Sequence, residues 1–208
     1  MRIMTFSRRA IGTGLLCLGL LQASAGAATA PLATLLQQQD YKAAEPQIRP
    51  LLAKRQAKEP ERALIYGWLF AHDDMPELDR RSRQGSASVD LQAAGRLALE
   101  TRDFERARQS FQGALEMAGR PADRAAALKG LGQVEYQLRH FDASLVQLEA
   151  SLKAFPSADA YAALNETLIR LGRTDEAITA AQRAVELNPW QELAHYQLGN
   201  GYTRKNYT

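Results

Sequence analysis

Apolar and small residues recur at three- and four-residue steps over most of the chain beyond residue 30. This spacing places them on one face of a helix, and it predicts a series of amphipathic helices. Alanine, leucine, glutamine, glutamate and arginine are abundant, and no run of β-branched or aromatic residues alternates at period two. We therefore expect an all-α protein.

One helical pattern occurs three times, at residues 88–120, 126–156 and 158–189. Each segment predicts a first helix, a short turn and a second helix, and the second and third segments end in Pro156 and Pro189. A single hairpin of this size cannot bury its own apolar face. Consecutive hairpins are therefore expected to stack on one another.

The residues at corresponding positions of these segments follow a known pattern. The third segment supplies Tyr161, Leu164, Leu168, Gly172, Ala177, Ala181, Ala184 and Pro189. The second supplies Leu128, Leu131, Gly132, Phe141, Leu148 and Pro156, and the first Leu91, Ala94, Gly95, Ala98, Phe104, Ala107, Phe111 and Ala114. These segments resemble tetratricopeptide repeats. The resemblance implies a right-handed superhelical solenoid of antiparallel helical hairpins, and it specifies a fold rather than a particular function.

Small residues at fixed positions indicate close packing between the helices. Gly95, Gly132 and Ala177 let neighbouring helices approach, and Phe111 is expected to fill the space between hairpins. Gly172 stands where a helix ends, so we expect it to have the left-handed backbone conformation.

The repeat pattern weakens toward the N-terminus, and we predict three regions. Residues 1–27 form a signal peptide, residues 28–86 form degenerate helical hairpins of the same type, and residues 87–208 form the solenoid. Pro46 and Pro50 are expected to shorten a helix, and the polar residues 80–86 are expected to form an exposed connection. The solenoid contains three full repeats and the first helix of a further, truncated one, so we expect the natural chain to continue beyond Thr208.

The first residues are typical of a bacterial export signal. Arg2, Arg8 and Arg9 precede an apolar run at residues 11–21, and small residues follow it, with Ala27 as the expected cleavage position. The run is too short to span a bilayer, so no stable membrane anchor is expected. The paired arginines fit a twin-arginine signal, and the same features fit the general secretory route; both remain open. Either route predicts a periplasmic protein.

Removal of this signal changes the charge of the chain. No acidic residue precedes Asp40, and once the three N-terminal arginines are gone, basic and acidic residues are equal in number. The near-zero net charge and the export signal argue against nucleic acid as a partner. The mature chain also loses Cys17, its only cysteine, and with it any disulfide or thiol nucleophile.

The sequence contains no recognised catalytic, metal-binding or cofactor-binding motif. His72 lies at a helix end, His140 in a repeat turn and His195 beside Tyr196, and each is better explained as a capping or surface residue than as a catalytic group. We therefore expect a protein that is not an enzyme and needs no cofactor or metal.

A binding surface is the better-supported prediction. In tetratricopeptide repeats the first helices line a groove, and the resemblance implies that ligand contacts come from their inward positions. In this sequence the predicted peptide-binding residues are Gln92, Arg96, Lys129, Gln133, Tyr136, Arg170, Tyr196, Asn200 and Arg204. Arg96, Lys129, Arg170 and Arg204 recur once per repeat, which suits an extended peptide with acidic groups. The alternative is that these cations form an ordinary solvated surface.

Together these features predict a non-enzymatic, exported scaffold that binds proteins or peptides in the periplasm. The alternative is the N-terminal docking region of a larger periplasmic enzyme, or of a secretion or exopolysaccharide assembly in the cell envelope, whose active part lies beyond residue 208.

Overall fold

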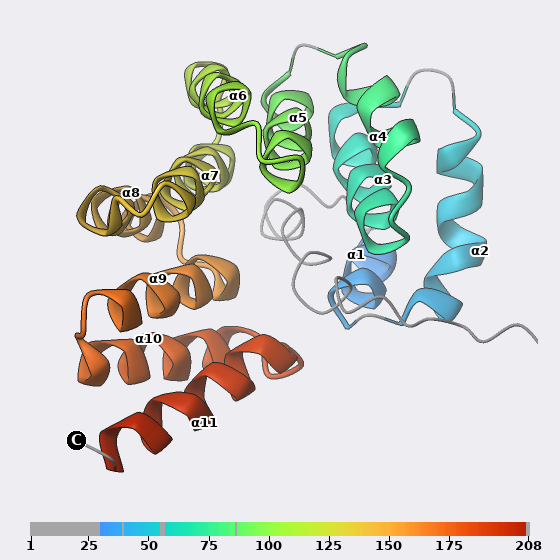
Figure 1. Ribbon diagram of the computed structural model, residues 1–208. Helices are drawn as coiled ribbons and strands as arrows, with labels where there is room; N and C mark the ends of the chain where they lie inside the picture. Colours follow the sequence, from blue (N-terminus) through green and yellow to red (C-terminus); the bar gives the residue numbers. More distant parts are fainter. Residues whose placement is uncertain (1–29, 39, 55–56, 86, 207–208) are drawn as a thin grey trace, which may run out of the picture.

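The computed structural model describes residues 30–206, apart from residues 39, 55–56 and 86 (Figure 1). Within those residues it contains eleven α-helices and no strand, so the all-α prediction is confirmed. The helices are α1 Ala30–Gln37, α2 Tyr41–Leu52, α3 Glu59–Ala71, α4 Met75–Ser82, α5 Ser88–Glu100, α6 Phe104–Glu116, α7 Pro121–Gln137, α8 Phe141–Ala154, α9 Ala158–Arg170, α10 Thr174–Leu187 and α11 Glu192–Asn206. The predicted signal peptide lies outside the described residues.

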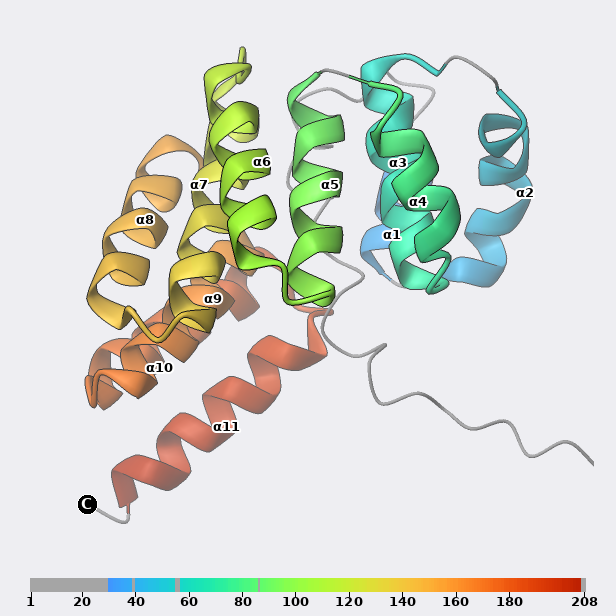
Figure 2. The same cartoon turned by 45° about the horizontal axis from the view of Figure 1, so that its top comes forward.

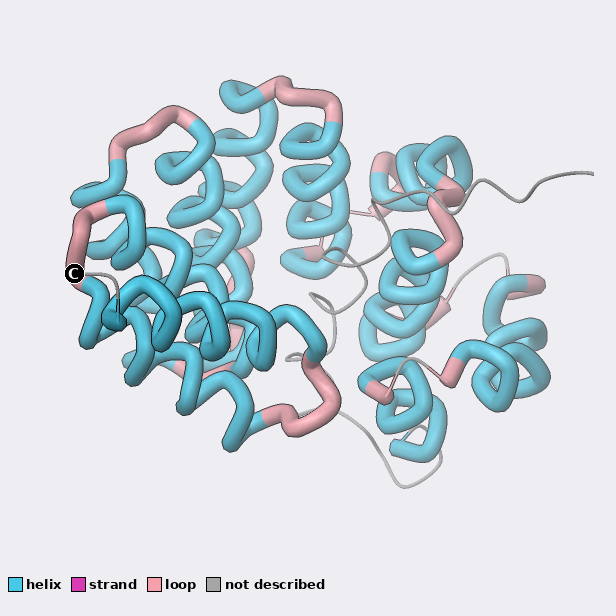
Figure 3. The backbone as a smooth tube through the Cα atoms, turned by 60° about the horizontal axis from the view of Figure 1, so that its bottom comes forward, coloured by secondary structure: helices cyan, strands magenta, loops and turns pink. Residues whose placement is uncertain are grey.

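The helices form stacked hairpins. The first helix of each hairpin packs on the first helix of the next, as α3, α5, α7, α9 and α11 do in turn. The second helix of each hairpin packs against both its own partner and the first helix that follows. The hairpins follow a curved path from α1 and α2 at one end to α11 at the other (Figures 1 and 2). Short loops join them (Figure 3). This arrangement is the expected helical solenoid.

Four hairpins turn through the same kind of connection. Its middle residue has a positive φ, which is 57° at Asp73, 60° at Arg102, 65° at Arg139 and 77° at Gly172. The next residue is the N-cap of the second helix: Asp74, Asp103, His140 and Arg173, respectively. Its N–H donates to a carbonyl in the last turn of the first helix, at 2.8 to 2.9 Å. This is a Schellman motif, and it confirms the left-handed conformation predicted for Gly172.

Phe111 of α6 is wedged between two glycines. A Cβ atom on Gly95 of α5 would lie 2.9 Å from its ring, and one on Gly130 of α7 would lie closer still. Gly132 has the same relation to Leu148 of α8, at 2.8 Å. Real Cβ atoms do not approach neighbours so closely, so these helices can pack at this separation only with glycine at those positions. The predicted close packing at Gly95 and Gly132 is confirmed.

The prediction that two prolines shorten a helix was wrong. Pro46 and Pro50 both lie inside α2, which continues to Leu52. They are one turn apart and exposed, so the backbone hydrogen bonds that they remove lie on the solvent side. Ala44 and Ile48 on the opposite face are fully buried. Packing of that face maintains the helix despite the two prolines.

The prediction of an exposed connection at residues 80–86 was wrong for its first part. Helix α4 includes residues 80–82, and Ser82 is buried. Asp74 caps the helix by accepting a hydrogen bond from the Glu77 N–H at 3.3 Å. The Glu77 carboxylate then pairs with Arg80 and Arg81 along the helix, which stabilises the arginine-rich turn.

The N-terminal hairpins share a core with the repeat that follows. A cluster of buried apolar side chains runs from Leu32 through α3 and α4 and includes Val89 and Ala93 of α5. Apolar packing therefore continues across the predicted boundary between residues 86 and 87. The division into degenerate and regular repeats stays a prediction.

Candidate functional site

The first helices of three consecutive repeats border a cavity of about 470 Å³, here called the inner groove. Most of its lining comes from α5, α7 and α9, and Gln191 and Leu193 also line it. Three residues that the sequence predicted for a groove are part of this lining: Arg96, Gln133 and Tyr136. Polar and charged side chains make up much of the remainder, and they decide what the groove can bind.

Arg96 and Lys129 are buried rather than exposed on a basic surface. Only 7% of Arg96 and 6% of Lys129 is accessible to solvent. The Arg96 guanidinium lies over the ring of Phe70, 3.8 Å from its centroid, a cation–π contact with the preceding hairpin. Lys129 Nζ lies 3.8 Å from Asp159 Oδ2. Both cations are therefore fixed by contacts with adjacent hairpins.

Asp159 is the carboxylate at the centre of this arrangement. Its Oδ1 accepts a hydrogen bond from Gln191 Nε2 at 2.9 Å. Burial raises the pKa of Asp159, and the positive charges of Lys129 and Arg96 and the bond from Gln191 act in the opposite direction. Asp159 thus links α7, α9 and the residues before α11.

A second carboxylate lies about two turns further along α9. Gln197 of α11 donates from Nε2 to Glu166 Oε1 at 3.1 Å and to the carbonyl of Ala162 at 3.2 Å. Burial raises the pKa of Glu166, and the hydrogen bond from Gln197 lowers it. Two glutamines from the C-terminal part of the chain therefore hold two partly buried acids on one helix.

Each of these glutamines has an acceptor atom with no donor. Gln191 Oε1 and Gln197 Oε1 are buried, and neither accepts a hydrogen bond within the described part of the chain. A buried acceptor without a donor loses its hydration and gains nothing in return, which costs about 1–3 kcal/mol. Gln191 also lines the groove, but its Oε1 atom is shielded from solvent and is not presented to a ligand.

Tyr136 and Arg170 surround Phe141. The Tyr136 ring meets the Phe141 ring edge-on, with centroids 5.6 Å apart, and the Arg170 guanidinium carbon lies 5.3 Å from the Phe141 centroid. Burial, and the nearby charge of Glu166, raise the pKa of Tyr136. Arg170 is exposed and does not line the groove. Arg102, which the sequence did not single out, does line it and makes no ion pair within the described residues.

The other predicted residues lie outside the inner groove. Gln92 is buried and donates to Ser88 Oγ at 3.0 Å, so it belongs to the packing of α5. Tyr196, Asn200 and Arg204 are exposed on α11, with 71% of Tyr196 accessible. The four cations expected as one ladder thus have different environments, two buried and two exposed.

Sequence reasoning missed Asp159 and Gln191. A signal for the aspartate existed, because each first helix of a full repeat carries an acid in its first turn: Asp90, Asp123 and Asp159. All three are paired with a cation. Gln191 lies in the loop between α10 and α11, and no pattern marks it.

The described residues offer no site for metal chemistry. Among them, no group of three or more His, Cys, Asp or Glu side chains could hold a metal ion. His72 stacks on Trp68 at 3.8 Å between ring centroids, and His140 Nδ1 lies 3.0 Å from Glu135 Oε2. In the same part of the chain, no helix combines the length and the apolar character needed to cross a membrane.

Comparison with known proteins agrees with the fold. Residues 93–147 and 130–192 match the tetratricopeptide repeat family, so repeats of this type are present at residues 93–192. No curated protein matches the sequence. Among solved structures, MamA (residues 41 to the end) from Desulfovibrio magneticus RS-1 is similar with a TM-score of 0.51 and 24% identity, over 68% of this chain and 82% of that one.

Two further structures have the same architecture. The crystal structure of MamA matches with a TM-score of 0.50 and 17% identity, over 74% of this chain and 87% of that chain. The APC/C hetero-tetramer Cut9–Hcn1 matches with a TM-score of 0.57 and 16% identity, over 82% of this chain and 35% of that one. Identities this low show a shared fold.

Proposed function

Because residues 93–192 carry tetratricopeptide repeats, we propose that this protein is a non-enzymatic scaffold that binds an extended segment of a partner protein in the inner groove. The observation that carries the proposal is the inner groove itself, which the first helices of three consecutive repeats line with polar side chains such as Gln133 and Tyr136. Polar side chains along such a groove can form hydrogen bonds with the backbone of an extended peptide. The groove volume of about 470 Å³ lies within the range of ordinary ligand sites.

The proposed partner segment carries acidic groups. Arg102 at the groove and exposed Arg170 nearby are the cations available to its carboxylates, since Arg96 and Lys129 are already packed against Phe70 and Asp159. Glu100 and Glu166 also line the groove and repel a uniformly acidic ligand. The proposed ligand therefore places its carboxylates toward Arg102 and Arg170, and neutral residues beside α9.

We further propose that the scaffold acts in the periplasm. The support is the sequence of residues 1–27, with its arginines, short apolar run and small residues before the cleavage position. Fractionation of cells that express the full chain tests this: release of a shortened protein by osmotic shock is expected. Retention of the full-length form in the cytoplasm would overturn the location and leave the groove proposal intact.

Site-specific photo-crosslinking in cells tests the groove. A photo-reactive residue at Gln133, which lines the groove, should give a discrete adduct with one partner. The same residue at Lys153, exposed on α8 and outside the groove, is the matched control and should not. A synthetic peptide from the crosslinked segment should then bind the purified protein.

Charge reversal completes the test. Arg102→Glu with Arg170→Glu should weaken binding of that peptide about tenfold or more, because two charge-assisted contacts become repulsive. Both side chains are exposed, so the fold should survive. Unchanged affinity in this variant, or equal crosslinking from positions 133 and 153, would contradict a groove-bound acidic segment.

A further inference from the structure

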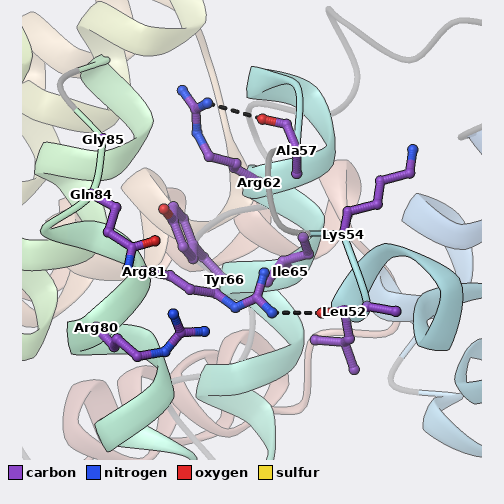
Figure 4. A pocket seen from close by; sticks show the side chains of 11 residues that line it. Leu52, Lys54, Ala57, Arg62, Ile65, Tyr66, Arg80, Arg81, Gln84 and Gly85 are labelled. Carbon is purple, nitrogen blue, oxygen red and sulfur yellow. Dashed lines mark hydrogen bonds between the residues drawn. The ribbon is translucent and has the colours of Figure 1, made fainter.

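A second, larger cavity lies outside the inner groove, among α2, α3 and α4 (Figure 4). Its volume is about 980 Å³, and four cations line it: Lys54, Arg62, Arg80 and Arg81. No carboxylate occurs among the described residues that line it. This cavity is called the basic pocket below.

The carboxylates that pair with these cations are not among the residues that line the pocket. Lys54 Nζ donates to Glu61 at 2.5 Å, Arg62 Nε lies 2.8 Å from Asp90, and Arg80 and Arg81 share the carboxylate of Glu77. Four cations therefore face three anions. The pocket keeps an excess of positive charge, and the nearby anions fix the cations in place.

Two of the arginines are also held by backbone carbonyls. Arg62 Nη1 donates to Ala57 at 3.0 Å, and Arg81 Nη2 donates to Leu52 at 2.6 Å, as the dashed lines in Figure 4 show. Arg80 binds Glu77 through Nε and Nη2. The Nη1 groups of Arg80 and Arg81 make no hydrogen bond within the described residues. These side chains are ordered before a ligand arrives, so binding costs little rotamer entropy.

The base of the pocket is apolar and rigid. Tyr66 and Ile65 are fully buried, and the Tyr66 hydroxyl donates to Asp90 Oδ1 at 2.7 Å. Gly85 lies at the edge, and the Asp90 carboxylate occupies the space where a side chain at that position would be. The pocket thus combines an apolar base with cations from three separate segments of the chain.

We propose that the basic pocket binds a segment of a partner protein that carries at least two carboxylate side chains. Guanidinium groups pair with carboxylates through two parallel hydrogen bonds, and cations on separate segments require more than one carboxylate to engage them. The volume is that of a sizeable ligand site and exceeds the needs of a single small anion. This site is independent of the inner groove.

Fluorescence anisotropy with labelled hexaglutamate tests the proposal on the purified chain. Hexaglutamate should bind, and hexaglutamine should not. Lys54→Gln with Arg80→Gln should weaken the affinity about tenfold or more, because two of the four cations are lost. Both side chains are about half exposed, so the fold should persist. Arg83→Gln is the matched control: Arg83 pairs with Asp79 and does not line the pocket, so the change should be below about twofold.

Three results would overturn the proposal. Equal weakening by Arg83→Gln would show a diffuse charge effect. Loss of hexaglutamate binding in Arg102→Glu with Arg170→Glu would place the peptide at the inner groove. Binding of pyrophosphate or citrate that depends on Lys54 and Arg80, without binding of hexaglutamate, would assign the pocket to small anions.

Discussion

A few residues in this protein have a backbone conformation or a degree of burial that is unfavourable for their side chain or charge. Three hairpin turns place Asp73, Arg102 and Arg139 in the left-handed region, and only the fourth uses glycine, at position 172. The left-handed conformation costs a residue with a Cβ atom about 1–2 kcal/mol. Two partly buried carboxylates, Asp159 and Glu166, carry a second kind of penalty through lost hydration. The packing around these residues must supply the compensating stability.

Replacement of Gly172 tests the backbone penalty. Gly172→Ala should lower the free energy of unfolding by about 1 kcal/mol, because φ is 77° and nothing lies within 4 Å of the added Cβ atom. Gly119→Ala is the control: its surroundings are also open and its φ is not positive, so a change within about 0.5 kcal/mol is expected. Urea denaturation measures both. Equal effects would show that the backbone conformation is not the cause.

The buried carboxylate of Glu166 should make stability depend on pH. Burial raises its pKa in the folded chain above the ordinary value of 4.5, so the folded chain binds more protons than the unfolded chain between these two values. The free energy of unfolding of the wild-type chain therefore falls as pH rises through that interval. Glu166→Gln does not show this fall. The difference in free energy of unfolding, variant minus wild type, should therefore rise from pH 4 upward and level off above the pKa of Glu166 in the folded chain.

Denaturant unfolding at a series of pH values measures this difference. The control is Glu149→Gln, an exposed glutamate on α8, which should show no such slope. A flat difference for Glu166→Gln, or one that falls with pH, would contradict the raised pKa.

Single elements were predicted well where periodicity alone determines them and poorly where tertiary contacts decide. The three full repeats have the predicted helices because their apolar positions repeat at helical spacing. Helix α2 continues through Pro46 and Pro50, contrary to expectation, because its other face is buried against α1 and α3. Helix α4 includes arginines that were assigned to a loop, because Glu77 pairs with two of them. The burial behind α2 cannot be inferred from local propensity, whereas the Glu77 pairs lie within one helix at three- and four-residue spacing and could have been read from the sequence.

The prolines of α2 should limit its stability. Pro46→Ala should raise the free energy of unfolding by up to about 3 kcal/mol, since an interior proline removes a hydrogen bond and its exposed ring contributes no core packing. Pro121→Ala, at the first position of α7, is the matched control and should change stability by less than about 0.5 kcal/mol. Thermal unfolding of the two variants measures the difference. No gain from Pro46→Ala would mean that α2 has adapted to its prolines.

Each hairpin of the molecule packs mainly on adjacent hairpins, and the candidate site is built from several of them. Arg96 is held by Phe70 of the preceding hairpin, and Lys129 by Asp159 of the following one. Sequence spacing predicted an inward position for Arg96, which lines the inner groove. It gave no measure of depth, so it could not separate these two buried cations from the exposed Arg170. Burial of a long side chain depends on residues from other repeats, which a single repeat does not reveal.

Local contacts also predict uneven stability along the solenoid. Helix α2 packs mainly on α1 and α3, whereas α7 packs on four other helices of the described chain. Amide hydrogen exchange should therefore be fastest in α1 and α2 and slowest in α6, α7 and α8. Exchange followed by mass spectrometry on peptic fragments measures this. Uniform protection across the chain would show that the array unfolds as a single unit.

The Schellman turns have a consequence for where the chain can change in length. In four hairpins the last residue of the Schellman motif is also the N-cap of the second helix. The connection is three residues long in each of these hairpins. Connections between hairpins differ in length, as at residues 83–87, 117–120 and 155–157. An inserted epitope tag or a natural insertion would break both helix ends in a hairpin turn, whereas in the longer connections between hairpins it can be placed away from the capping residues. Length variation among related chains should therefore accumulate between hairpins, and that is also where a reporter peptide can be placed.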